Sequence, residues 1–311
     1  MSRRVYIHIG LEKTGSTAFQ SVCQENVDNL RSCRILYPQS CLSSKQHGIL
    51  ARAYKRDIRL SWDEISRFKR ELMEEIENFD GSVLLSAEEF SWLDRSEISD
   101  LRNFLKDYDV KVLIVLRNQV EYINALYAEH VRWSKSPAGF KDFCLLRSGK
   151  MDYESLVNDW NNAFPDCIEL IVYNRDTVVN DILSRVGVDL RAAQILNTHE
   201  SHHPTLPPEL VEIQSILANN REGRLFQEEL WKCFGRAQDL GIYFKKMWQM
   251  PAAFEQQFAS FELGNSNIAK RFGIEGLLFG NNLIDCFRDA VREGHCPNPI
   301  AAVALFTFLK G

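Results

Sequence analysis

The sequence predicts a three-layer α/β/α protein with a central parallel sheet and a helical C-terminal part. Up to about residue 200, short β-rich runs alternate with segments whose apolar residues recur at helical spacing. Such alternation produces parallel strands joined by right-handed helical crossovers. Beyond that point the strand pattern fades and helical periodicity remains.

Four segments carry the strand pattern, and helical patterns separate them. The predicted strands are 5–9, 82–85, 110–116 and 168–173, and the third is apolar at nearly every position, as a strand buried on both faces would be. The predicted helices are 17–30, 62–76, 98–105, 119–133, 210–217, 225–234, 277–287 and 300–309. No repeat or low-complexity linker interrupts the chain, so we expect a single domain over 1–311, with an α/β core at about 1–200 and a helical part at about 201–311.

Composition excludes several classes of partner. The formal net charge of −5 and the sequence pI of about 5.9 disfavour nucleic acid and anionic membranes, both of which need a basic field. No apolar run reaches the roughly 18–20 residues of a membrane span. The eight cysteines form no C-x-x-C pair, which is typical of a reduced, cytoplasmic protein.

The loop between the first strand and the first helix is the main candidate site. Gly10 and Gly15 have the G-x-x-x-x-G separation of a P-loop, but Ser16 occupies the place of the usual lysine, and Lys13 lies inside the loop instead. Backbone amides and the helix N-terminus can still hold a phosphate. A lysine at position 13 can reach the bridging oxygen of a phosphosulfate, where negative charge grows as the sulfonyl group departs. The alternative is an ordinary strand-to-helix turn with a solvated lysine.

Residues 8–20, His-Ile-Gly-Leu-Glu-Lys-Thr-Gly-Ser-Thr-Ala-Phe-Gln, closely resemble the 5′-phosphosulfate loop of the PAPS-dependent sulfotransferase family, especially its bacterial carbohydrate-type members. The resemblance implies a P-loop-type fold and 3′-phosphoadenosine-5′-phosphosulfate (PAPS) as co-substrate, with no metal. It implies that Lys13 is the catalytic lysine, and that the 5′-phosphosulfate is also bound by Thr14, Gly15, Ser16 and Thr17.

A second segment, 116–127, is similar to the family's 3′-phosphate segment. Arg117 fits the arginine that ends a buried strand there, whereas Ala125 stands where a serine is expected. The loss of one 3′-phosphate hydrogen bond costs about 1 kcal/mol, or up to about 3 for a charge-assisted one. The alternative for Arg117 is a surface ion pair. The resemblance also implies that the region around Ser201 covers bound PAPS and that Ser201 contacts it.

Sulfonyl transfer is helped by a base that takes the acceptor's proton. Glu88 follows the second predicted strand, in a segment that resembles a serine-rich S-S-E segment of bacterial family members. Lys13, Glu88 and Arg117 each follow the carboxyl end of a predicted strand, the edge where open α/β sheets bind ligands. For Glu88 the alternative is a helix-start carboxylate that stabilises backbone amides. His47 is a second candidate base, or else an ordinary loop histidine.

Two further patterns are weaker indications of chemistry. Residues 199–203 match H-E-x-x-H, the zinc-protease signature, but Pro204 disfavours helical geometry there and the segment is predicted to be a loop. Eight C-terminal aromatic residues could line an acceptor cleft, although a place in the helical core is the simpler expectation. They are Trp231, Phe234, Tyr243, Phe244, Trp248, Phe254, Phe258 and Phe261.

The sequence therefore predicts metal-free, in-line sulfonyl transfer from PAPS to a small-molecule or glycan acceptor, with a carbohydrate hydroxyl implied by the resemblance. One rival is a P-loop kinase of small molecules, which the displaced lysine disfavours. The other is a non-catalytic nucleotide-binding or interaction protein of the same fold, which Ala125 motivates.

Overall fold

A computed structural model describes residues 3–55, 59–132, 139–188, 225–240, 247–274 and 283–294, with isolated positions at 208, 210, 211, 213 and 307. Packing divides the chain into two compact units. The first comprises 1–117, 153–201 and 267–278, and the second comprises 118–152, 202–266 and 279–311. The described strands all belong to the first unit. The single-domain assignment stays a prediction.

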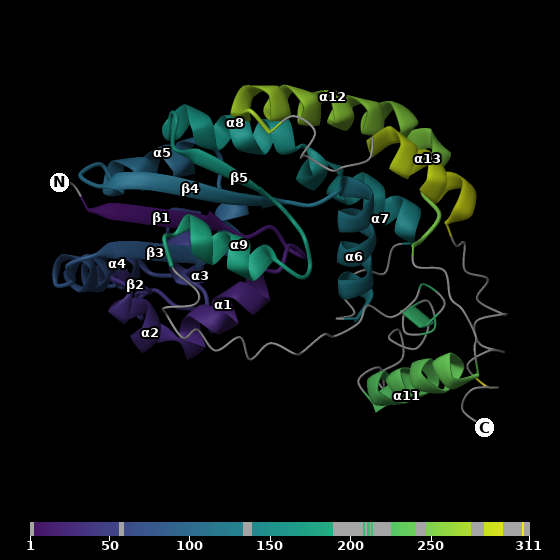
Figure 1. Cartoon of the computed structure of the whole chain (residues 1–311), viewed down its shortest axis with the longest axis horizontal. Helices are drawn as coiled ribbons and strands as arrows, with labels where there is room; N and C mark the ends of the chain where they lie inside the picture. The colour runs from purple at the N-terminus through teal and green to yellow at the C-terminus, as the bar shows by residue number, and fades with distance from the viewer. Residues whose placement is uncertain are drawn as a thin grey trace. The chain divides into compact units, whose positions relative to one another are not determined.

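The first unit is built on a five-stranded parallel sheet of order β2-β3-β1-β4-β5 (Figure 1). Its strands are β1 (Arg4–Ile9), β2 (Ile35–Leu36), β3 (Ser82–Ala87), β4 (Asp109–Leu116) and β5 (Ile168–Val172). The four predicted strands are confirmed, whereas β2 was missed. A two-residue strand is too short for its apolar pattern to be distinguished from a loop.

Helices cover both faces of this sheet, because alternate strand residues point to opposite sides. One face packs against α1 (Ser16–Glu25), α2 (Val27–Ser32) and α9 (Val178–Arg185), with Phe19 and Ile182 in its core. The other face is covered by α3 (Gly48–Tyr54), α5 (Arg95–Phe104) and α8 (Tyr153–Ala163), while α4 (Trp62–Glu77) packs beside α3 (Figure 1). The predicted three-layer, P-loop-type α/β/α fold is confirmed.

Local signals explain where two of these helices begin. Ser61 and Glu64 form a reciprocal capping box at the start of α4, and Asp94 and Glu97 form another at the start of α5. Each box satisfies two backbone donors that the first helical turn leaves without an intrahelical partner. Short 3₁₀ turns also occur at η1 (Glu88–Trp92), η2 (Ser148–Met151) and η3 (Ala252–Phe254).

The second unit combines residues 118–152 with most of the C-terminal part, and the described residues of the C-terminal part are mainly helical, as predicted. The helices of the second unit are α6 (Gln119–Arg132), α7 (Phe140–Arg147), α11 (Leu225–Asp239), α13 (Leu283–Glu293) and, up to residue 266, α12 (Glu255–Phe272). The predicted helices at 210–217 and 300–309 lie almost entirely outside the described residues. Across the described helices of both units, none is both long and apolar enough to cross a membrane.

The C-terminal aromatic residues that the structure describes are mostly core. Trp248, Phe254 and Phe258 are buried, and the Phe258 ring stacks on Phe287 with 4.6 Å between centroids. The side chain of Trp231, with Tyr243 and Phe244, lies outside the described residues. Among the residues described, a place in the core therefore fits better than an acceptor cleft.

Candidate functional site

The candidate site lies at the carboxyl edge of the sheet, beside the central strand. After β1 the chain goes on to build β2 and β3 on one side, and only then crosses to β4 on the other side of β1. In an open α/β sheet, this reversal leaves a crevice at the carboxyl ends of the two strands, where ligands bind. Residues 10–15 leave the end of β1, and Arg117 leaves the end of β4.

The two glycines of the loop are required by its geometry. Gly15 has φ of 82°, in the left-handed region that disfavours side chains, and a Cβ there would lie 2.8 Å from Val178 Cγ1. A Cβ on Gly10 would lie 2.6 Å from the Cβ of Ser16. The glycine spacing recognised in the sequence therefore allows the loop to fold tightly against α1 and α9.

Lys13 is the only non-glycine residue between Gly10 and Gly15 with a positive φ, at 62°. Such a conformation is uncommon for a residue with a side chain and marks a locally strained turn. Thr14 closes this turn, since its hydroxyl donates to the Leu11 carbonyl at 2.6 Å and its N–H donates to the same oxygen at 3.3 Å. The buried Thr14 side chain thus shapes the loop, and its assignment as a contact to the 5′-phosphosulfate of PAPS stays a prediction.

Arg117 holds the other side of the turn. Its Nη1 donates to the Lys13 carbonyl at 3.0 Å, and its guanidinium lies 4.8 Å from the ring centroid of Tyr173, just after β5. The Tyr153 hydroxyl in turn donates to the Arg117 carbonyl at 2.7 Å. The structure therefore brings Arg117 next to Lys13 through a contact with the loop itself, and the assignment of Arg117 to the 3′-phosphate stays a prediction. Ala125 belongs to α6 of the second unit.

The N-terminus of α1 presents a site for an anion. Helix α1 begins at Ser16 with Gly15 as its N-cap, so no side chain caps it, and its first turn contains no acidic residue. The first amides of a helix lack intrahelical acceptors, and the helix dipole adds positive charge at that end. Thr17 is exposed in this first turn. The loop amides can therefore bind a phosphate or sulfate group.

Glu88 lies against this helix end. It begins η1 immediately after β3, and its carboxylate accepts a hydrogen bond from the Ser16 hydroxyl. Its N–H donates to Gln46 Oε1 at 3.0 Å. The carboxylate predicted as the base is thus adjacent to the loop, although β3 lies about seventy residues further along the chain.

His47 is a structural residue. It is fully buried, its Nε2 donates to the Pro38 carbonyl at 2.9 Å, and its Nδ1 accepts the Ser86 N–H at 3.0 Å. Burial lowers the pKa of His47 to about 4. Because both ring nitrogens are bonded to backbone groups, His47 has no lone pair left to accept a substrate proton. The neighbouring acid Glu89 is also buried, with Oε1 3.9 Å from Arg52 Nε.

Sequence reasoning missed a buried polar cluster beneath the loop. His8, on β1, contacts Ser86 Oγ through Nδ1 at 2.8 Å, and Gln20 Nε2 donates to the same Ser86 oxygen at 3.1 Å. His8 is fully buried, and burial lowers its pKa to about 3. One signal was present in the sequence: Ser16 and Gln20 are four residues apart and therefore share a face of α1.

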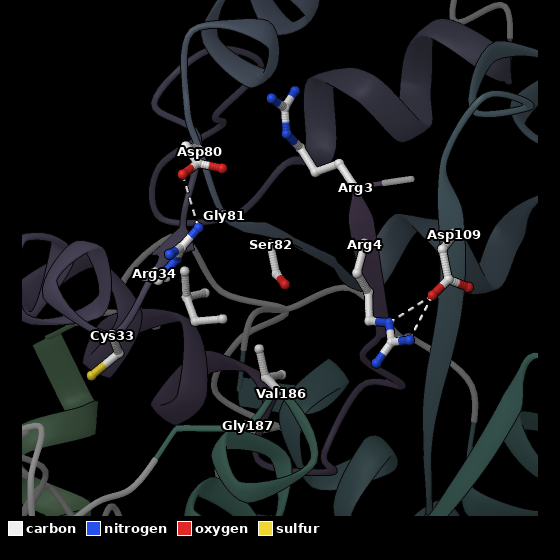
Figure 2. A pocket seen from close by; sticks show the side chains of 11 residues that line it. Arg3, Arg4, Cys33, Arg34, Asp80, Gly81, Ser82, Asp109, Val186 and Gly187 are labelled. Atoms are coloured by element: carbon white, nitrogen blue, oxygen red, sulfur yellow. Dashed lines mark hydrogen bonds and ion pairs between the residues drawn. The ribbon is translucent and has the colours of Figure 1, made fainter. Parts of the chain in front are cut away.

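A separate hollow of about 500 Å³ lies at the amino ends of the strands, the edge opposite the loop. Figure 2 shows the side chains that line it. Three arginines line it, but each already has a protein partner. Arg4 binds Asp109 at 2.6 Å, Arg34 binds Asp80 at 2.9 Å, and Arg3 donates to the Ile76 carbonyl at 2.7 Å. We assign no function to this hollow, since each of the three guanidinium groups already has a protein partner.

Some predicted features lie outside the described residues. These are Ser201 and the whole H-E-x-x-H match at 199–203. Among the residues that are described, no group of His, Cys, Asp and Glu is arranged to hold a metal ion.

Comparisons with known proteins give little further identification. No protein-family model matches the chain. It is 27% identical over 161 residues to an uncharacterized protein of Archaeoglobus fulgidus, a match that covers 48% of this chain and 41% of that protein. This chain thus spans about two-fifths of that relative's length.

Among solved structures, it is similar to a sulfotransferase from Alicyclobacillus acidocaldarius, with a TM-score of 0.40 and 13% identity. That similarity covers 72% of this chain and 94% of the other. Values this low do not identify an activity, and the fold stated above follows from this chain's own strands and helices.

Proposed function

We propose that this chain is a sulfotransferase that moves the sulfonyl group of PAPS to a hydroxyl or amine acceptor. The observation that carries the proposal is the position of Lys13. It lies inside the glycine turn, next to the uncapped N-terminus of α1, in a backbone conformation that Arg117 holds through the Lys13 carbonyl. A cation at this point of an anion-binding loop suits a leaving group whose charge grows at the bridging oxygen.

The reaction is a single in-line displacement. The acceptor oxygen or nitrogen attacks sulfur, the bond from sulfur to the 5′-phosphate oxygen breaks, and adenosine 3′,5′-bisphosphate leaves. Lys13 donates a hydrogen bond to the departing oxygen, while the amides of the loop and of Ser16 and Thr17 bind the phosphate. Glu88 takes the acceptor's proton as the new bond forms. The scheme requires no metal ion.

Other parts of the proposal have sequence support alone. The resemblance to carbohydrate-type members favours a sugar hydroxyl as acceptor, and it supports a 3′-phosphate contact from Arg117 and a donor contact from Ser201. A cytoplasmic location and the absence of nucleic-acid partners stay predictions from composition.

A small-molecule kinase fits the loop less well. In a P-loop kinase the residue after the second glycine is a lysine that reaches the β- and γ-phosphates. Here that residue is Ser16, and its hydroxyl donates to Glu88. A non-catalytic nucleotide-binding protein is the second candidate, because Ala125 lacks the hydroxyl expected for the 3′-phosphate.

The test is release of adenosine 3′,5′-bisphosphate from PAPS, measured with and without a panel of sugars and amino sugars. We expect acceptor-dependent release that persists in EDTA. Lys13→Ala should lower kcat by about 10²–10³-fold, the usual effect of removing one group that stabilises transition-state charge. Lys55→Ala is the matched control, since Lys55 pairs with Glu97 at 3.1 Å and takes no part in the loop.

Two results would contradict the proposal. One is turnover of ATP with Mg²⁺ and none of PAPS, which would support the kinase. The other is a biological output that Lys13→Ala leaves intact, which would support a non-catalytic role.

A further inference from the structure

We propose that Gln20 and Gln46 are positioning residues, which hold Glu88 against the first turn of α1 through a ring that three hydrogen bonds and the α1 backbone close. The ring runs from Ser16 along α1 to Gln20, across to Gln46, and back through Glu88 to Ser16. The inference rests on the proposed function only for its effect on turnover, because the ring can be tested without it.

Two residues on one face of α1 contact the end of β3. Ser16 and Gln20 are separated by one helical turn. The Ser16 hydroxyl donates to the Glu88 carboxylate, and Gln20 Nε2 donates to Ser86 Oγ at 3.1 Å. The helix that forms the anion site is thereby bonded, at two successive turns, to the segment that carries the candidate base.

Gln46 is the residue that closes the ring. Its Oε1 accepts the Glu88 N–H at 3.0 Å and also Gln20 Nε2 at 3.3 Å. Glu88 is the first residue of η1, so its N–H has no acceptor within that turn, and a side chain 42 residues away in sequence supplies one. The direction in which Glu88 leaves β3 therefore depends on Gln46.

The segment that carries Gln46 is fixed to the same strand end. The His47 N–H donates to the Ser86 carbonyl at 2.7 Å, and the Ser86 N–H donates to His47 Nδ1 at 3.0 Å. His8 contacts Ser86 Oγ from β1. Since His8 and His47 are both fully buried, the support beneath Glu88 is uncharged at working pH.

This arrangement matters for the proposed reaction because the base and the donor loop would move as one body. Misplacing a catalytic group by about 1 Å can cost about 10²-fold in rate. The Gln20–Gln46 pair connects the Glu88 backbone to α1, the helix proposed to bind PAPS. The distance from the Glu88 carboxylate to the sulfur of PAPS therefore does not depend on the Ser16 contact alone.

The experiment compares Gln46→Leu with Gln24→Leu. Gln24 is the control because it lies on α1, like Gln20, and its Nε2, like that of Gln20, donates to a glutamine oxygen, here Gln39 Oε1 at 2.9 Å, away from Glu88. The first measurement is amide hydrogen exchange and amide chemical shift at Ser16 and Glu88 by NMR. We expect Gln46→Leu to lower exchange protection at Glu88 and to shift the Ser16 amide, whereas Gln24→Leu changes neither.

The second measurement is kinetic. We expect Gln46→Leu to lower kcat by about 10- to 100-fold while affinity for adenosine 3′,5′-bisphosphate stays within about twofold. In a Glu88→Gln background the same change should have little further effect, since Gln46 acts through Glu88. Equal losses in both backgrounds, or parallel losses of kcat and ligand affinity, would indicate a general structural role and overturn the inference.

The two proposals fail separately. If the wild-type chain does not turn over PAPS, the proposed function fails, and the NMR comparison still decides whether Gln46 holds Glu88. Unchanged Ser16 and Glu88 amides in a folded Gln46→Leu variant would overturn the positioning role whatever the activity.

Discussion

Acidification should destabilise the α/β unit, because two histidines are buried in it as neutral imidazoles. His8 and His47 are both fully buried, and burial lowers their pKa values to about 3 and about 4. In the unfolded chain a histidine titrates near pKa ~6.5. Since the folded pKa values are depressed, the unfolded state binds protons first as the pH falls, and folding loses stability between about pH 6.5 and the folded pKa values.

The magnitude follows from these values. At about pH 5 each imidazole is protonated in the unfolded chain and neutral in the folded one. This pH lies about 1.5 pH units below the unfolded pKa, and each unit lowers the free energy of unfolding by about 1.36 kcal/mol, so each histidine costs about 2 kcal/mol. The two histidines together should lower the free energy of unfolding by about 4 kcal/mol between about pH 7.5 and about pH 5. Typical domains have only about 5–15 kcal/mol in all, so the effect is large.

The assay is urea unfolding at both pH values, followed by hydrogen exchange of the β1 and β4 amides, which belong to the first unit. The His8→Asn variant keeps a polar group beside Ser86 but removes the titration. Its loss of stability on acidification should be smaller than that of the wild type by about 2 kcal/mol, and other titrating groups cancel in this comparison. Equal losses in the two proteins would refute the reasoning.

Two other substitutions test the loop. Gly15→Ala should destabilise the fold by about 1–3 kcal/mol, measured by urea unfolding, because φ is 82° and the added Cβ meets Val178, and it should also weaken binding of adenosine 3′,5′-bisphosphate. Normal stability and normal binding would contradict this account of the loop. Arg117→Lys should weaken binding by about 10-fold or more in calorimetry, because lysine cannot both bond the Lys13 carbonyl and stack on Tyr173 as the guanidinium does. Unchanged affinity would remove Arg117 from the site.

Much of the fold could be predicted because it depends on local pattern. The buried strand β4 is apolar at every position from Val112 to Leu116, and the first helix has a clear apolar face, so both could be recognised without knowledge of the rest of the chain. The helices α8 and α9 were not predicted. Their interior residues, such as Trp160 and Ile182, are buried by packing against the sheet, and the pattern in each short segment is ambiguous by itself.

The site was predictable where its residues follow strand ends, and not where they depend on tertiary partners. Lys13, Glu88 and Arg117 each follow a strand, so the topology alone brings them to one edge of the sheet. By contrast, Gln46 and His47 look alike in sequence as loop residues. Only the folded chain shows that Gln46 accepts the Glu88 N–H. Likewise, only the folded chain shows that both ring nitrogens of His47 are hydrogen-bonded to the backbone of Pro38 and Ser86.

The central claim is that a lysine ammonium inside the glycine turn meets the anionic end of a nucleotide without help from a metal. Calorimetric titration with adenosine 3′,5′-bisphosphate, in EDTA and in Mg²⁺, tests it most directly. We predict equal affinity in both conditions, and affinity about 10-fold weaker for Lys13→Ala, as expected when a charge-assisted hydrogen bond is lost. Absence of binding, binding only with Mg²⁺, or identical affinity in the Lys13→Ala variant would contradict the claim.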